Sequence, residues 1–140
     1  MLEFIKNFTD KSIGAYIQID DKFFLTDKNY DLTPKHIGVF LGENKDKQFI
    51  PSIELIELLS HISNKKVFVT DKAEWKFLNK KDILGKAITK ANVYTGFVLV
   101  QNKNDENLGY GKFILDIKRK EEVVVKNLLD RGEYLRCESR

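Results

Sequence analysis

The chain has 140 residues, 42% of them hydrophobic and 32% charged, which suits one ordinary domain or two very small ones with a packed core. Lys and Arg number 24 against 21 for Asp and Glu, so the net charge of +3 permits nucleic-acid binding only where cations gather on one surface. The single cysteine excludes an intrachain disulfide and a cysteine metal cluster, and no apolar run reaches the roughly 20 residues of a membrane span. We see no secretory signal and expect a cytoplasmic protein.

The first 64 residues predict a small α+β domain. Apolar side chains three and four apart in residues 1–8 indicate a short amphipathic helix. Two strand-like runs, 14–19 and 22–26, flank Asp20 and Asp21, which is typical of a hairpin. The segments that follow are predicted as a loop over 28–35, a strand over 37–41, a polar turn over 42–47 and a strand from 48 to 50.

A helix closes this first part. Ser52 is placed to cap it, and its buried stripe is formed by the Leu and Ile residues between positions 55 and 62. The helix ends near residue 63, and a new strand-like run begins at residue 66. We therefore place a domain boundary between residues 64 and 65.

The second part, residues 65–140, predicts mostly short strands. Asp71 and Glu74 have the spacing of a capping box that opens a short helix ending at Leu78. The remaining segments are predicted as a strand over 66–69, a polar turn over 79–85, a strand over 97–100, a hairpin turn over 102–107 and a returning strand over 108–115. Gly109 and Gly111 within that last strand indicate a bulge or bend, as in a small barrel.

The stretch from Val123 to Glu138 predicts a strand, a tight turn at Asp130–Gly132, and a second strand over 133–137. Six cations lie on or beside it, and we interpret them as candidate RNA contacts: Lys118, Arg119, Lys120, Lys126, Arg131 and Arg136. An ordinary solvated surface is the alternative, because Glu121 and Glu122 follow the first three directly.

Four motifs in this order carry a resemblance: residues 51–59 (PSIELIELL), 66–78 (KVFVTDKAEWKFL), 96–111 (GFVLVQNKNDENLGYG) and 130–136 (DRGEYLR). The last resembles the end of a PUA domain, a small RNA-binding pseudo-barrel. Together they resemble a shortened, archaeal-looking form of the nuclear-import-protein-seven family of large-subunit ribosome-biogenesis factors. The resemblance implies an RNA surface on the last strands and the first PUA helix, which adds Lys76 and Lys80 to the candidates.

Other candidate residues favour structural roles. We interpret Trp75 as a core residue rather than a base-stacking platform, and we place Tyr110 and Tyr134 in the core as well. The two histidines, His36 and His61, are too isolated for a metal site, and Cys137 has no evident base partner. We assemble no catalytic group and expect neither enzymatic activity nor a cofactor.

The sequence therefore predicts an α+β protein with a small N-terminal domain and a PUA-like β pseudo-barrel. Its expected function is to bind single-stranded or irregular ribosomal-RNA precursor during processing and assembly of the large subunit, with RNA and other assembly proteins as partners. Two alternatives remain. One is a protein–protein adaptor that docks through helix 52–63, and the other is an accessory domain for an RNA-modifying enzyme acting in trans, or an enzyme whose site the sequence does not reveal.

Overall fold

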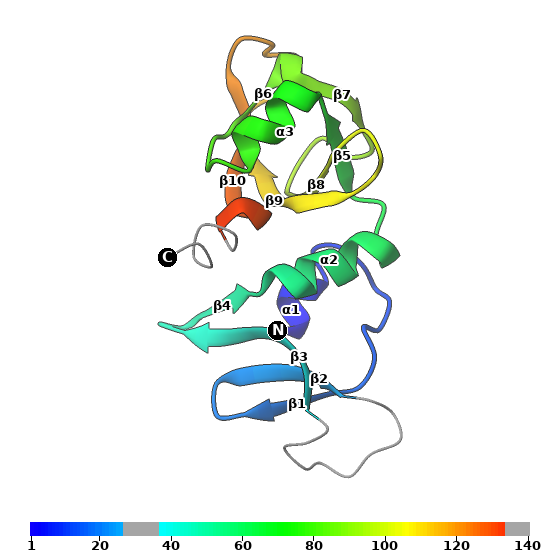
Figure 1. Ribbon diagram of the computed structural model, residues 1–140, viewed down its shortest axis with the longest axis vertical. Helices are drawn as coiled ribbons and strands as arrows, with labels where there is room; N and C mark the ends of the chain where they lie inside the picture. The colour runs from blue at the N-terminus through cyan, green and yellow to red at the C-terminus, as the bar shows by residue number, and fades with distance from the viewer. Residues whose placement is uncertain (27–36, 134–140) are drawn as a thin grey trace. The chain divides into compact units, whose positions relative to one another are not determined.

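The computed structural model describes residues 1–26 and 37–133 (Figure 1). The predictions for loop 28–35, His36, Tyr134, Arg136 and Cys137 lie outside these residues. The chain divides into two compact units, Met1–Ile62 and Ser63–Arg140, each with its own helices and sheet. The architecture is mixed α+β, with a nearly closed β pseudo-barrel in the second unit.

The first unit is a four-stranded antiparallel sheet with its strands in chain order. Its elements are α1 (Leu2–Ile5), β1 (Tyr16–Ile19), β2 (Lys22–Thr26), β3 (Ile37–Lys45), β4 (Gln48–Pro51) and α2 (Ile53–Ile62). The predicted first hairpin is confirmed, because Ile19 pairs with Lys22. The predicted turn over 42–47 is too long, since β3 continues to Lys45 and only Asp46 and Lys47 turn the chain.

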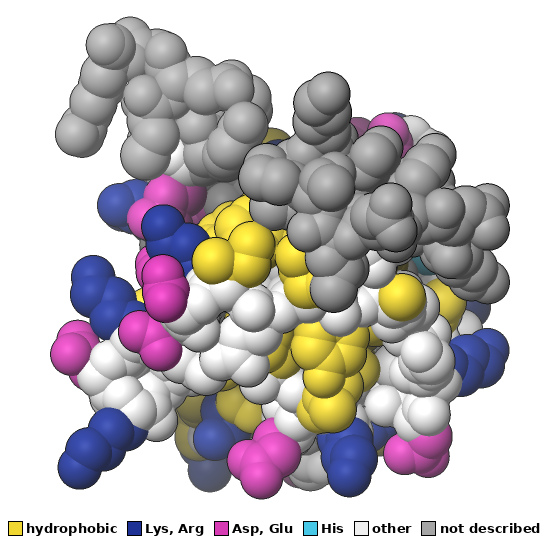
Figure 2. Space-filling view, turned by 90° about the horizontal axis from the view of Figure 1, so that it is seen from below, with side chains coloured by type: hydrophobic (Ala, Val, Ile, Leu, Met, Phe, Trp, Pro, Cys, Tyr) yellow, Lys and Arg dark blue, Asp and Glu magenta, His cyan; other side chains and the backbone are white. Residues whose placement is uncertain are grey.

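Helix α1 packs on this sheet through aromatic rings, and α2 lies against β3. The ring of Phe49 lies 5.5 Å from that of Phe4 and 5.8 Å from that of Phe23. The predicted cap of α2 is confirmed, because the Leu55 backbone N–H donates to Ser52 Oγ over 3.1 Å. The strands also expose large apolar side chains, among them Ile19 and Ile50, and the surface seen in Figure 2 shows hydrophobic side chains between charged ones.

The second unit is a six-stranded sheet in the order β6-β10-β9-β8-β5-β7. Its elements are β5 (Lys66–Val69), α3 (Asp71–Phe77), β6 (Ile83–Leu84), η2 (Gly85–Ala87), β7 (Ile88–Ala91), β8 (Phe97–Gln101), β9 (Asn107–Phe113) and β10 (Val123–Asp130). The short 3₁₀ turn η2 joins β6 and β7, the two end strands, so the chain itself spans the gap in the barrel. Strands β5 and β8 pair in parallel, whereas the other neighbours pair antiparallel.

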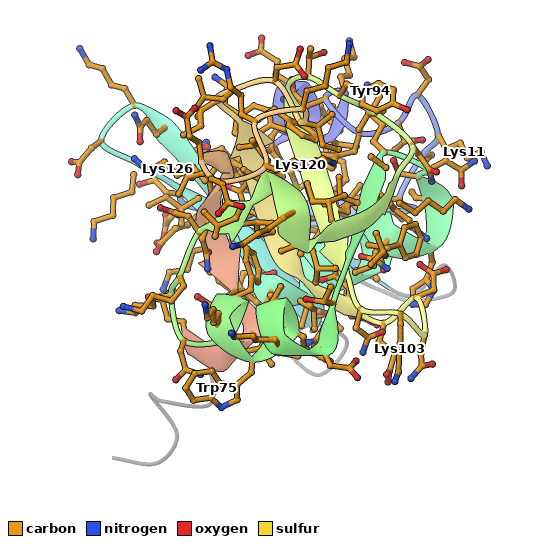
Figure 3. The ribbon with its side chains drawn as sticks, turned by 90° about the horizontal axis from the view of Figure 1, so that it is seen from above. Lys11, Trp75, Tyr94, Lys103, Lys120 and Lys126 are labelled. Atoms are coloured by element: carbon orange, nitrogen blue, oxygen red, sulfur yellow. The ribbon has the colours of Figure 1, made fainter. Side chains whose placement is uncertain are left out.

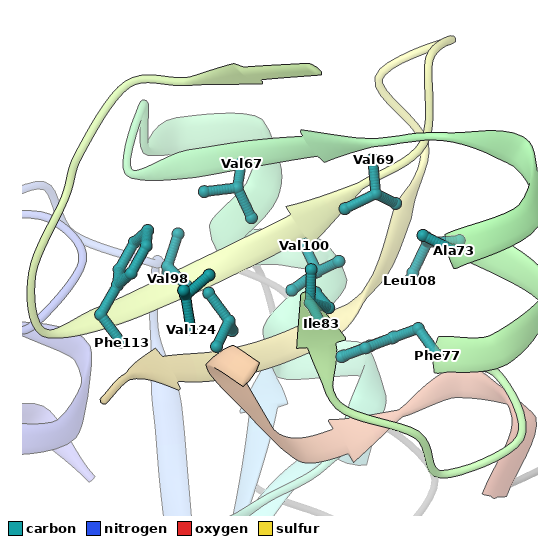
Figure 4. Close-up of a cluster of buried hydrophobic side chains, with 11 residues drawn as sticks. Val67, Val69, Ala73, Phe77, Ile83, Val98, Val100, Leu108, Phe113 and Val124 are labelled. Atoms are coloured by element: carbon teal, nitrogen blue, oxygen red, sulfur yellow. The ribbon is translucent and has the colours of Figure 1, made fainter. Parts of the chain in front are cut away.

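The inside of this barrel is filled by β-branched residues and closed by α3 (Figure 4). Val98 and Val100 of β8 meet Val124 and Val125 of β10 there, and all four are fully buried. Phe77 projects from α3 and is also fully buried. Full burial of one such side chain contributes about 1.5–3 kcal/mol, so this cluster accounts for much of the stability of the unit.

Helix α3 begins one residue earlier than its predicted capping box. The cap is Thr70, whose Oγ1 accepts from the Ala73 backbone N–H over 3.1 Å, and Asp71 is already helical. The Glu74 carboxylate accepts instead from Asn102 Nδ2. Thr70 is itself extended and directly follows β5, so its hydroxyl reaches the free N–H groups of the first turn better than a side chain inside the helix does.

The predicted bulge at Gly109 is confirmed. Its φ is +144°, a β-carbon there would lie 2.0 Å from the Leu129 carbonyl oxygen, and the pairing of β9 with β10 shifts nearby. The predicted turn over 79–85 is wrong in part, because it contains β6, which pairs with Val123 and Val125 of β10. Strand β7 was not predicted.

The predicted turn and the start of the second C-terminal strand are also wrong within the described residues. Strand β10 runs through to Asp130, and residues 131–133 are helical. The Glu133 backbone N–H donates to Asp130 Oδ1 over 2.8 Å, so Asp130 caps a helical turn instead of opening a hairpin. Residues 134–137 of the predicted second strand lie outside the described residues.

Candidate nucleic-acid interface

A cleft of about 750 Å³ lies between α3 and the segment that contains β6 and η2. Apolar groups from Ala73, Leu84 and Val123 line part of it. Four exposed lysines also line it: Lys72, Lys76, Lys81 and Lys86. One of these, Lys76, was predicted as an RNA contact, while Lys72, Lys81 and Lys86 were not.

Trp75 lies at this cleft with its side chain in solvent. Its 69% exposure shows that the predicted core position is wrong. Helix α3 buries the face that carries Ala73 and Phe77, and Trp75 lies about 200° around the helix from each of them. Figure 3 shows Trp75 projecting away from the barrel, and its backbone carbonyl accepts from Asn79 Nδ2 over 2.7 Å.

Positive charge dominates the lining of the cleft. Among the residues that the structure describes, Lys72, Lys76 and Lys81 make no ion pair, whereas Lys86 Nζ lies 2.9 Å from Glu121 Oε2. Among the described residues of the lining, Asp82 carries the single carboxylate, and its Oδ1 accepts from the Asn127 backbone N–H over 2.8 Å. The cleft therefore offers cations to an anionic ligand.

The predicted triad Lys118, Arg119 and Lys120 lies in the segment between β9 and β10 and does not line this cleft, although the Lys86 backbone N–H donates to the Lys120 carbonyl oxygen over 3.0 Å. Arg119 Nη1 lies 3.5 Å from Glu122 Oε2. Of the two carboxylates that were expected to neutralise the triad, Glu122 therefore does pair with it. Lys118 lines a second hollow together with Tyr94.

Lys126 is exposed on β10, as expected for a strand cation. Its predicted neighbour Arg136 lies outside the described residues, and the cation beside it is Lys112 of β9, the Cα partner of Lys126. Sequence reasoning missed Lys112, because the register of β9 on β10 is not encoded in either strand alone. Figure 3 shows Lys126 and Trp75 projecting from different parts of the unit.

The last two predicted contacts differ in their surroundings. Arg131 directly follows β10 and is half-buried, and its Nε donates to the Asn107 carbonyl oxygen over 3.2 Å, which ties it to the barrel. Lys80 is exposed in the turn after α3, with a φ of +68°. The neighbouring Lys81, rather than Lys80, lines the cleft.

Burial tests the predicted position of Tyr110. Tyr110 is buried, which confirms its core position, and burial raises the pKa of its hydroxyl to about 12. His61 is exposed on α2, with Nε2 3.5 Å from Glu57 Oε1. Within the described ranges no three His, Cys, Asp or Glu side chains converge as metal ligands, and no helix there is long and apolar enough to cross a membrane.

A cleft of this kind suits a chain of bases and phosphates. An exposed indole is a stacking surface for a base, and stacking of this type is worth about 1–3 kcal/mol per base. Ammonium groups on flexible stems neutralise phosphates without fixing their geometry. The arrangement of Trp75 with its neighbouring lysines therefore favours a flexible single strand over a rigid duplex.

Comparisons with known proteins agree with this fold. Residues 65–139 match the family described as the UPF0113 PUA domain. A UPF0113 protein of Archaeoglobus fulgidus is 34% identical over 113 residues, which are 76% of this chain and 64% of that protein, so the chain spans slightly less than two thirds of its relative.

Two solved structures share the architecture at low identity. A conserved PUA domain protein from Thermoplasma acidophilum is 18% identical, with a TM-score of 0.60 over 96% of this chain and 89% of that one. A hypothetical protein from Pyrococcus horikoshii is 16% identical, with a TM-score of 0.53 over 82% of this chain and 72% of that one.

Proposed function

Because the chain belongs to the UPF0113 PUA-domain family, we propose that it is a non-enzymatic RNA-binding protein. The cleft beside α3 takes a single-stranded or irregular segment of the RNA. The observation that carries this proposal is that four lysines and an exposed Trp75 line one cleft. The predicted contacts are thereby revised toward α3, with Lys76 retained and Lys81 in place of Lys80.

Two contributions set the expected affinity. Each lysine that neutralises a phosphate releases a counterion, so log K falls with log salt by about 0.7 per phosphate on a single strand. Stacking on Trp75 adds a contribution that depends little on salt or on base identity. Binding in the micromolar range, weak in sequence preference and steep in salt, is the expected behaviour.

The test is a titration of uridine-rich and mixed oligonucleotides at two salt concentrations. The variant Lys76→Glu with Lys81→Glu should weaken binding at least tenfold and lower the salt slope by about 1.4, since two phosphate contacts are lost. Trp75→Ala should weaken binding at both salt concentrations and leave the slope unchanged.

A matched control keeps the net charge change equal. Lys45 and Lys47 are exposed at the end of β3 and in the turn to β4, in the first unit. Replacing both with Glu changes the charge of the protein as much as the cleft variant does. The proposal would be overturned if the Lys76→Glu, Lys81→Glu variant bound RNA as tightly as the parent. It would also be overturned if that variant and the control lost RNA affinity equally.

We further propose that the RNA is a precursor of large-subunit ribosomal RNA and that the protein acts in ribosome biogenesis. The support is the resemblance of four motifs to the nuclear-import-protein-seven family of large-subunit ribosome-biogenesis factors, together with membership of a PUA-domain family. Crosslinking in cells, followed by sequencing of the bound RNA, tests this directly. Recovery of messenger or transfer RNA in place of ribosomal precursors would contradict it.

A protein–protein adaptor remains the second candidate because of one observation. A hollow of about 670 Å³ is lined by Tyr94, Ile114 and Leu115, which are 61%, 51% and 41% exposed. The apolar stripe of α2, which the adaptor hypothesis used, is buried instead. Pull-down with and without ribonuclease separates the two candidates, since partners held through RNA are lost on digestion.

A further inference from the structure

Three residues form a row across three neighbouring strands of the barrel. Phe97 of β8 is the Cα partner of Lys112 on β9, and Lys112 is in turn the Cα partner of Lys126 on β10. Directly opposite residues project from the same face of a sheet, with β-carbons about 5 Å apart. Both lysines are exposed, so two ammonium groups share one small patch of surface.

This arrangement costs stability in the free protein. Like charges directly opposite each other on paired strands repel. Within the described part of the chain, neither lysine has a carboxylate partner, and the Asp82 carboxylate lies on the β6 side of β10, bonded to the Asn127 backbone. Lys112 Nζ lies 5.4 Å from the centre of the Phe97 ring, a contact that positions the cation and leaves its charge in place.

A second lysine in the same unit shows what is unusual about this pair. Lys90 of β7 lies over the ring of its cross-strand partner Phe68, with Nζ 5.5 Å from the ring centre. This is the same contact that Lys112 makes, without a second lysine opposite. The repulsion at Lys112 and Lys126 therefore comes from their register and not from the ring contact, and a bound anion would remove it.

The lysine pair is connected to the cleft by β10. Val123, the first residue of this strand, lines the cleft, and Lys126 follows three residues later. At about 3.3 Å per residue, this places Lys126 about 10 Å along the strand from the cleft. An extended RNA strand that leaves the cleft along β10 meets the two ammonium groups next.

We propose that Lys112 and Lys126 form a second phosphate-binding site, which holds the backbone of the RNA strand that leaves the cleft. This inference rests on the proposed function and deepens it, because it sets a path and a minimum length for the RNA. Bases are read or stacked beside Trp75, and the lysine pair binds phosphates regardless of sequence.

The test compares two lengths of RNA on three single variants. Lys112→Glu and Lys126→Glu should each weaken binding of an oligonucleotide of about 12 nucleotides by about fivefold to tenfold, and should leave one of about 2 nucleotides, too short to reach from the cleft, unaffected. Lys90→Glu is the matched control, with the same charge change and the same loss of a ring contact as Lys112→Glu. It should bind both RNAs as the parent does.

Thermal stability separates a binding role from a structural one. Either Glu variant places a carboxylate opposite the remaining lysine, so its melting temperature should equal or exceed that of the parent while RNA affinity falls. If a Glu variant proves unstable, Lys112→Gln and Lys126→Gln remove the charge, retain much of the stem and give the same comparison of lengths.

The outcomes for the two sites are distinct. If Lys76→Glu with Lys81→Glu abolishes binding but Lys112→Glu and Lys126→Glu bind the longer RNA like the parent, this inference is overturned and the cleft stands. If the Lys90→Glu control weakens the longer RNA equally, the effect is one of overall charge and the inference is again overturned. If the Lys76→Glu, Lys81→Glu variant binds both the short and the long RNA like the parent, the proposed function itself is overturned.

Discussion

Lys86 Nζ lies 2.9 Å from Glu121 Oε2, and this ion pair ties η2 to the segment that joins β9 and β10. Both side chains are more than half exposed, so the pair contributes at most about 1 kcal/mol to stability. Lys86 also lines the cleft, and a phosphate that enters there competes with Glu121 for the same ammonium group.

Glu121→Gln should therefore tighten RNA binding by about twofold to fivefold at low salt, because it removes the competing carboxylate and leaves the fold intact. Fluorescence anisotropy with a short oligonucleotide measures the change. Glu122→Gln is the matched control, since neither Glu122 nor its partner Arg119 lines the cleft. Weaker binding by Glu121→Gln would contradict a role for Lys86 in the cleft.

Thr70→Ala should lower the free energy of unfolding by about 1 kcal/mol, because the Ala73 backbone N–H loses the acceptor that caps α3. Urea denaturation measures the loss, and Thr70→Ser should restore most of it. If Asp71→Ala lowered the free energy of unfolding as much as Thr70→Ala does, Asp71 would be the cap, as the sequence predicted.

Gly109→Ala should be severely destabilising, by at least about 3 kcal/mol, because the new β-carbon would meet the Leu129 carbonyl oxygen at 2.0 Å in a backbone with φ +144°. Gly96 provides the comparison, with a φ of +76° and, among the described residues, no atom within 4 Å of an added β-carbon. Gly96→Ala should cost only about 1–2 kcal/mol, the strain of a left-handed residue. Similar losses for the two variants would show that β10 can move away from β9.

Tyr110 should make stability fall in strong alkali. Its folded-state pKa of about 12 exceeds the ordinary tyrosine value of 10.0, so its contribution to stability is complete below pH 10 and is lost as the pH rises toward 12. Within that window the free energy of unfolding should fall by about 1.4 kcal/mol per pH unit from this group. Tyr110→Phe should remove that slope, because it keeps the ring and deletes the hydroxyl. Tyr94→Phe, at an exposed position, should leave the slope unchanged. An unchanged slope in Tyr110→Phe would contradict the raised pKa.

Elements held by local signals were predictable from sequence. The β1–β2 hairpin turns at two aspartates, and α2 carries its own cap in Ser52. By contrast, β6 has two residues and forms only by pairing with β10, about forty positions later, so its own segment reads as a polar turn. The helical turn after β10 had a signal that was not used, because Asp130 and Glu133 have the spacing of a helix cap.

The candidate site was predicted only in part, for a similar reason. Lys76 was found because the resemblance points at the helix that carries it, and Lys126 because it lies in a β-branched run. The exposure of Trp75 depends on which face of α3 meets the barrel, and the place of Lys112 depends on the register of β9 against β10. Both depend on tertiary packing, which the periodicity of a single segment does not predict.

The strand order of the barrel also bears on how the protein is made. In the first unit each strand pairs with the next one along the chain, so that sheet can assemble as it leaves the ribosome. In the second unit β6 finds its partner in β10, the last of the described strands to be synthesised. A nascent or truncated chain that ends before residue 123 therefore presents an open strand edge, which is a hazard for aggregation.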